Sequence, residues 1–196
     1  MRDKRFDNRS KDTFKKDIAF GTAIEKYFWA GFLDQLTKYN VEYANARDNG
    51  VGNDGEYVET GTNTAGADYI IDIKHGEEWK RNIPMEVKWV PTAGKLTLKK
   101  ADLKAYRAEN AAILFIFNSV RDNVNLRKPS DYDLDAHIKR IEGKRHHLRW
   151  GVMFPNRVQR VLDNANFEPI PYMGNKIGVI IKQGDFNNWF KTNKWL

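Results

Sequence analysis

Apolar and polar positions along the chain follow helical spacing in some segments and strand-like spacing in others. In residues 17–40 the large apolar side chains recur close to helical spacing, which predicts a long amphipathic helix. The segments ADYIIDIKH (67–75) and IPMEVKWVP (83–91) are rich in β-forming residues and enclose the polar stretch GEEWKRN (76–82). This pattern predicts two strands joined by a turn.

The second half of the chain predicts further elements of both kinds. Leu and Tyr positions in KLTLKKADLKAYRAEN (95–110) have helical spacing, and AAILFIFNSV (111–120) is a continuous apolar run typical of a fully buried strand. NRVQRVLDNA (156–165) predicts a short helix, and KIGVIIKQ (176–183) predicts a further strand. Residues 48–66 are dense in Gly, Asn and Thr, which predicts a loop with a short strand at 56–60.

The order of these elements is helix, strands, helix, strand. It predicts an α/β domain with a central mixed sheet flanked by helices. A chain of 196 residues has the length of one ordinary domain, of about 100–200 residues. We therefore expect a single domain over residues 1–196, with a core of about residues 17–120 and a C-terminal extension of about residues 121–196.

Composition limits the chemistry that is open to this chain. No cysteine is present, which excludes disulfides, thiolate zinc sites and a cysteine nucleophile, and favours a reducing cytoplasm. The charged residues 1–17 contain no apolar signal region, and no apolar run approaches the roughly 18 residues of a membrane span. We expect a cytoplasmic protein without a membrane partner.

The chain is basic, with 33 Lys and Arg against 26 Asp and Glu and a formal net charge of +7. An excess of positive charge favours polyanionic partners such as nucleic acid. Solvated lysine faces explain the same composition equally well, so the charge needs support from motifs.

One short motif combines a carboxylate and a lysine on a predicted strand. Strand alternation places Glu86 and Lys88 of EVK on the same face. The same spacing occurs in DIK (72–74) and DLK (102–104), so the triplet alone decides nothing. EVK ends a strand, follows another strand that begins beside Asp68, and precedes a helix and the apolar strand. DIK would need a helix after it, where another strand is predicted.

This arrangement resembles the PD-(D/E)XK nuclease superfamily, which has restriction-endonuclease-like and Holliday-junction-resolvase-like members. In that family an acidic helix is followed by three strands, a helix and a fourth strand, and the segments FGTAIEKYF, GADYII, MEVKW and LTLKKADLKAYRAENAAILFIF match this layout over roughly residues 18–118. Ala67 stands where the family often has proline. The glutamine that is frequent on the helix after the motif has no counterpart, although Lys99 or Lys100 could reach the same place.

The resemblance implies a catalytic set of Asp68, Glu86, Lys88 and Glu25. Asp68, Glu86 and the carbonyl of Val87 would hold Mg²⁺, for which Mn²⁺ would substitute, and Glu25 would bind metal through water or at a second site. Lys88 would orient the attacking water or stabilise the developing charge. The alternative is an ordinary solvated strand pair with Lys88 as a cross-strand ion pair and Glu25 as an exposed helix residue.

Two basic groups are candidates for contact with the DNA backbone. The first lies before or on the helix that follows EVK, and the second ends in Trp150; their members are Lys95, Lys99, Lys100 and Lys104, and Lys139, Arg140, Lys144, Arg145, His146, His147 and Arg149. The adjacent histidines do not suit one zinc ion. Three aromatic residues near the C-terminus favour a core or oligomer contact: Trp189, Phe190 and Trp195.

The sequence therefore predicts a Mg²⁺-dependent DNA endonuclease of restriction-like or phage type. A Holliday-junction resolvase and an RNA-cleaving enzyme use the same chemistry and stay open as alternatives. A DNA-binding or assembly module that has lost catalysis is the alternative from another class. Symmetric cutting of two strands or two junction arms would imply a homodimer.

Overall fold

The computed structural model describes residues 10–49, 66–90, 95–118, 126–182, 185–189 and 191–196. In chain order, its elements are α1 (Lys11–Lys38), β1 (Tyr43–Asp48), β2 (Tyr69–His75), β3 (Glu78–Val90), β4 (Lys95–Lys99), α2 (Lys100–Ala108), β5 (Ala112–Asn118), α3 (Leu134–Gly143), η2 (Arg145–His147), β6 (Leu148–Met153), α4 (Pro155–Asn164), β7 (Glu168–Ile170), η3 (Pro171–Met173), β8 (Lys176–Lys182), α5 (Phe186–Trp189) and β9 (Thr192–Lys194).

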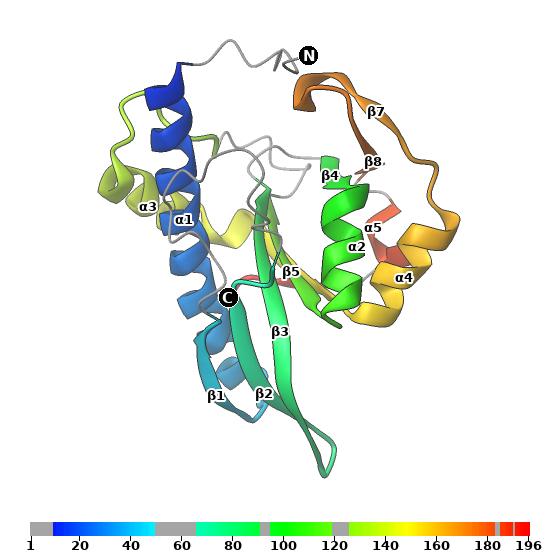
Figure 1. Ribbon diagram of the computed structural model, residues 1–196. Helices are drawn as coiled ribbons and strands as arrows, with labels where there is room; N and C mark the ends of the chain where they lie inside the picture. Colours follow the sequence, from blue (N-terminus) through cyan, green and yellow to red (C-terminus); the bar gives the residue numbers. More distant parts are fainter. Residues whose placement is uncertain (1–9, 50–65, 91–94, 119–125, 183–184, 190) are drawn as a thin grey trace.

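The described strands form two sheets. The larger sheet has the order β1-β2-β3-β5-β6-β9, and the smaller has the order β4-β8-β7. Only β3 and β5 are parallel neighbours in the larger sheet, and its other pairings are antiparallel. Helices lie on both sides of the larger sheet (Figure 1). The expected α/β class with a central mixed sheet flanked by helices is confirmed.

The core has two halves, one on each face of the larger sheet. Every residue of β5 is buried, because alternate side chains of this central strand enter opposite halves. Leu114 and Ile116 pack with α1, whereas Ile113, Phe115 and Phe117 pack with α2 and α4. This double burial explains why the sequence of β5 is continuously apolar.

Two predicted boundaries are wrong. The turn expected over 76–82 is confined to Gly76 and Glu77, because β3 starts at Glu78 and its polar residues pair with β2 in a long hairpin. The helix expected over 95–110 begins only at Lys100. The preceding KLTLK forms β4, since alternation buries Leu96 and Leu98 and leaves Lys95, Thr97 and Lys99 partly or fully exposed.

Helix α1 begins before the predicted residue 17 and ends at Lys38. Ser10 caps it, because its side-chain oxygen accepts a hydrogen bond from the Thr13 N–H at 3.1 Å. Although α1 has 28 residues, charged residues interrupt its apolar positions. No helix in the described part of the chain is long and apolar enough to cross a membrane.

The C-terminal region is built into both sheets. β6 and β9 extend the larger sheet, while β7 and β8 join β4 in the smaller one. β1, α3, β6, β7 and β9 were not individually predicted. Trp195 is buried and packs edge-on against Phe28, as expected for a core residue. Phe190 and the strand expected at 56–60 lie outside the described residues.

The contact of α1 with Trp195 yields a prediction about stability. A Cβ atom on Gly31 would lie 2.5 Å from Cζ2 of the Trp195 ring, so Gly31→Ala forces the buried ring to move. We expect a loss of about 1–3 kcal/mol in the free energy of unfolding, measured by urea titration. Gly21→Ala in the same helix is the control, because nothing lies within 4 Å of its Cβ. It should gain up to about 1 kcal/mol from helix propensity, and equal effects of the two changes would contradict this account.

Candidate active site

The candidate site lies where the C-terminal part of β3 continues past Tyr69, the first residue of the antiparallel strand β2. The last paired residues of these two strands are Tyr69 and Met85. On its other side, β3 keeps pairing with β5 as far as Val90. Among the described residues, one edge of β3 therefore has no strand partner over its last residues, and its backbone groups need other partners.

Two carboxylates provide those partners from different elements. The Val87 N–H donates to Oδ2 of Asp68 at 3.2 Å, and Asp68 lies immediately before β2. Farther along the same edge, the backbone of Trp89 hydrogen-bonds the carboxyl group of Glu25, which comes from α1. The end of β3 thus holds two acidic side chains beside its own backbone.

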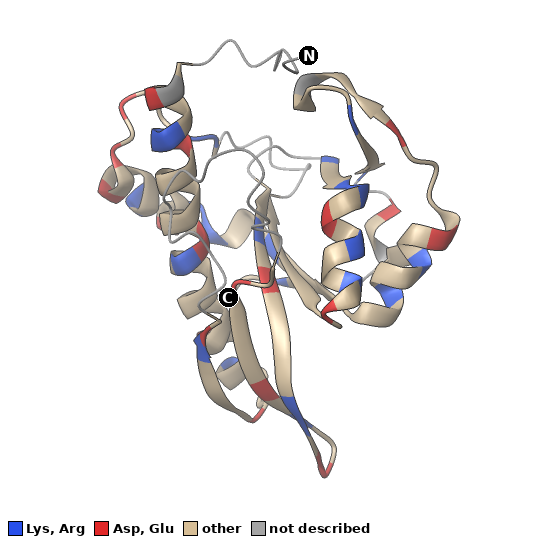
Figure 2. Ribbon diagram, in the orientation of Figure 1, with Lys and Arg blue, Asp and Glu red and all other residues tan. Residues whose placement is uncertain are grey.

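Glu86 and Lys88 point to the face of β3 that carries α2. Glu86 is only 3% exposed, and its Oε1 contacts the ammonium group of Lys88. The hydroxyl group of Tyr106, from α2, donates to the same oxygen at 2.8 Å. Figure 2 shows an acidic and a basic position next to each other on β3. Oε1 of Glu86 therefore has two partners, whereas its Oε2 is buried with no hydrogen-bond partner among the described residues.

Burial and mutual repulsion favour the protonated form of the two edge carboxyl groups. Burial raises the pKa of Asp68 to about 8, and the nearby negative charge of Glu86 adds to the rise while Lys88 opposes it. Burial likewise raises the pKa of Glu25 to about 7, again against the opposing effect of Lys88. Three carboxyl groups thus share one lysine in a place where water screens them poorly.

The lysine keeps its charge in this environment. Burial alone would lower the pKa of Lys88, but the negative charge of Glu86, followed by the effects of Tyr106 and Glu25, holds this pKa well above its usual value. Burial raises the pKa of Tyr106, so its hydroxyl group remains a hydrogen-bond donor to Glu86.

The oxygen donors of the site suit a hard divalent cation. Because the N–H and C=O of a strand residue point to the same side, the Val87 carbonyl lies on the edge that Asp68 occupies. Glu86 adds the unpartnered Oε2. Mg²⁺ is commonly held by one or two carboxylates, with water and phosphate completing its shell. In the described residues no group of three or more His, Asp or Glu is placed to hold a metal ion.

The structure brings together the four residues that the sequence singled out: Asp68, Glu86, Lys88 and Glu25. It adds Tyr106, which sequence reasoning assigned only to an apolar helix face. A buried tyrosine hydroxyl needs a partner, and that general rule was the one available signal. Lys99, one of the two lysines considered in place of the glutamine, pairs through its ammonium group with Asp102 at 3.2 Å.

The competing DIK triplet lies in a different setting. Asp72 accepts hydrogen bonds from the Asn82 N–H at 2.7 Å, the Asn45 side chain at 2.7 Å and Arg81 at 2.9 Å. The Asn82 amide foremost, with these other donors, lowers the pKa of Asp72 to about 2. Lys74 pairs with Glu42 at 2.8 Å. Every carboxylate oxygen and the lysine have partners, as in a structural cross-strand network.

Several cations that were expected to contact DNA are engaged within the fold. Arg149 donates to the carbonyls of His146 and Leu148, and Arg140 donates to the Arg127 carbonyl. Lys100 lies over the Phe167 ring at 4.7 Å. Arg145 is half-buried, while Lys104 and Lys144 are exposed and have no ion pair among the described residues. The rings of His146 and His147 lie 3.8 Å apart, side by side rather than around a shared metal.

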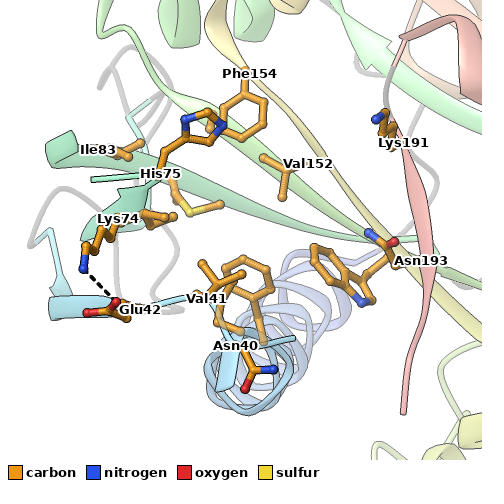
Figure 3. Close-up of a pocket in the computed structure, with 17 residues that line it drawn as sticks. Asn40, Val41, Glu42, Lys74, His75, Ile83, Val152, Phe154, Lys191 and Asn193 are labelled. Atoms are coloured by element: carbon orange, nitrogen blue, oxygen red, sulfur yellow. Dashed lines mark hydrogen bonds and ion pairs between the residues drawn. The ribbon is translucent and has the colours of Figure 1, made fainter. Parts of the chain in front are cut away.

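A separate cavity of about 420 Å³ lies on the α1 side of the larger sheet. Figure 3 shows His75, Phe154 and Val152 on one side of it and Asn40 and Val41 on another. Met85 lines it from β3, and strand alternation turns the neighbouring Glu86 to the opposite face. None of the candidate site residues lines this cavity.

Comparisons of the chain with known protein families, curated proteins and solved structures return no match.

The raised pKa of Asp68 predicts how stability depends on pH without metal. The unfolded carboxyl group ionises near pH 3.8 and the folded one near 8, so the folded state binds more protons between these values. Its stability must then fall as the pH rises through this window. Asp68→Asn keeps an oxygen that can accept the hydrogen bond from the Val87 N–H, and it removes the cost of ionising a buried carboxyl group.

We expect Asp68→Asn to raise the melting temperature in EDTA at pH 8 by roughly 2–4 °C, about 1 kcal/mol for a chain of this size, with little gain at pH 4. Asp102→Asn on α2 is the control, because Asp102 is a partly exposed carboxylate that pairs with Lys99 at 3.2 Å. A gain that is the same at both pH values would refute the assignment of the effect to ionisation of Asp68.

Proposed function

We propose that this protein is a Mg²⁺-dependent endonuclease that hydrolyses phosphodiester bonds in DNA. The observation that carries the proposal is the convergence of Asp68, Glu86 and Lys88 at the open end of β3, with one Glu86 oxygen buried and unpartnered. Carboxylates in such a position are costly unless a cation compensates them. The element order also supports the proposal, because an acidic helix, three strands of the larger sheet, a helix and a further strand of that sheet follow one another as expected for a PD-(D/E)XK nuclease, with β4 of the smaller sheet inserted before the second helix.

The residues of the site divide the work between holding a cation and handling the phosphate. A bound Mg²⁺ would polarise the phosphate and lower the pKa of a coordinated water. Asp68 and Glu86 would hold it, with the Val87 carbonyl on the same edge. Lys88, which keeps its charge, would orient the nucleophile or stabilise charge on the phosphate oxygens.

Tyr106 and Glu25 would support the cation site without being its direct ligands. Tyr106 fixes Oε1 of Glu86 by a hydrogen bond of 2.8 Å, which leaves Oε2 available for a cation. Glu25 sits on the same strand edge through the Trp89 backbone. We assign Glu25 to a water-mediated contact with the cation, and Tyr106 to positioning of Glu86.

The direct test is cleavage of plasmid, linear duplex, single-stranded and four-way-junction DNA with Mg²⁺, Mn²⁺ or EDTA. Lys88→Gln and Asp68→Asn should each lower the metal-dependent rate by at least about 100-fold, since each removes a charge from the reacting centre. Lys80→Gln and Asp102→Asn are matched controls, because Lys80 is exposed in the β2–β3 hairpin and Asp102 pairs with Lys99. They should cut at the rate of the unchanged protein.

The preferred substrate separates the possible nucleases. Preference for a four-way junction would identify a resolvase, and cleavage of linear duplex would identify a restriction-like or phage-type endonuclease. Binding without metal-dependent cleavage on every substrate would refute catalysis and leave the DNA-binding module.

A further inference from the structure

The smaller sheet assembles lysines from distant parts of the sequence on one of its faces. Lys95 of β4 lies directly opposite Lys182 of β8, and Thr97 lies opposite Ile180. Both lysines are exposed and make no ion pair with any described residue. Figure 2 shows basic positions on both strands. Only Lys95 was recognisable as a candidate from the sequence, because Lys182 follows it by more than eighty positions.

Like charges placed directly opposite each other on antiparallel strands destabilise a sheet, because their Cβ atoms lie about 4.5–5.5 Å apart. The buried face of the same sheet prevents the strands from shifting to separate the two lysines. Leu96 and Leu98 alternate with the lysines of β4 and are buried in the core half that contains Tyr106. The register of the two strands is thereby fixed, and the two ammonium groups share one surface.

Protection of a sheet edge explains only part of this pattern. Lysines on an exposed edge strand prevent pairing with other chains, and β4 is an edge strand. β8 lies between β4 and β7, pairing with β4 over residues 178–182 and with β7 over residues 176–178. Protection of an edge does not require two lysines to face each other across paired strands, so the register of Lys182 opposite Lys95 needs another explanation.

The lysine pair is close to the candidate active site along the chain and through the core. Val90 ends β3 and Lys95 begins β4, so five residue steps limit their separation to about 18 Å. At 3.4 Å per base pair, this is about five base pairs of duplex. β4 also continues directly into α2, which carries the Tyr106 hydroxyl to Glu86.

From this arrangement we infer that the Lys95–Lys182 pair binds the phosphodiester backbone of duplex DNA next to the point of cleavage. The inference depends on the proposed function for the identity of the polyanion. The phosphates would neutralise the repulsion between the two lysines, and backbone contact of this kind fixes the position of a duplex without reading its sequence.

The test measures binding of a fluorescein-labelled 30-base-pair duplex to the full chain in EDTA, where cleavage does not interfere, over a series of salt concentrations. Lys95→Gln and Lys182→Gln should each weaken binding about three- to tenfold and reduce the slope of log K against log salt by about 1, and the double variant should reduce it by about 2. The melting temperature of the free variants should stay the same or rise, because a repulsive pair has been removed.

Lys80→Gln removes the same charge from the far hairpin and should leave both affinity and slope unchanged. Slopes equal to that of the unchanged protein in both lysine variants would overturn the inference, as would the absence of duplex binding. If the lysine variants still cleave DNA and their binding has an unaltered salt dependence, only the DNA contact of the lysine pair is refuted. Lysine-dependent binding without cleavage would refute only the nuclease.

Discussion

The arrangement of the site depends on the edge of β3 beyond Met85, which has no strand partner among the described residues. Backbone groups on a buried strand edge need partners, and here side-chain carboxylates take the place of a neighbouring strand. Asp68 is brought to this edge by the start of β2, and Glu25 by a helix that packs against the same sheet. Because the parallel pairing with β5 holds the other edge of β3, Glu86 and Lys88 have a fixed direction. The end of β3 thus positions the carboxyl groups that hydrogen-bond its edge as well as its own side chains Glu86 and Lys88.

This arrangement leaves the site with more carboxyl groups than cations. Among the described residues, Asp68, Glu86 and Glu25 share one lysine, and the raised pKa values of Asp68 and Glu25 express the cost of ionising them there. The Asp72 network shows the contrast, since donors surround its carboxylate and lower its pKa. A carboxylate cluster that the fold leaves uncompensated is the arrangement expected where a cation and a phosphate complete the structure.

The sequence predicted the features that depend on local pattern. Apolar spacing predicts the buried strand β5, the helix α1 and the two strands of the β2–β3 hairpin. The order of these elements selects EVK and Asp68 as the candidate site. β4 was taken for helix because Leu96 also fits helical spacing when Leu103 and Tyr106 are considered. Tyr106 and Lys182 could not be assigned, because the contact of one with Glu86 and the register of the other opposite Lys95 are long-range features. The polar YANARD strand β1 has no apolar alternation to reveal it.

The central claim is that Asp68 and Glu86 form a divalent-cation site, and Mn²⁺ binding measured by electron paramagnetic resonance tests it most directly. The unchanged protein and Asp102→Asn should bind the ion alike at pH 8. Asp68→Asn should bind it at least about tenfold more weakly, because one of two anionic ligands becomes neutral. Equal Mn²⁺ binding by all three proteins, or no binding by the unchanged protein, would contradict the account.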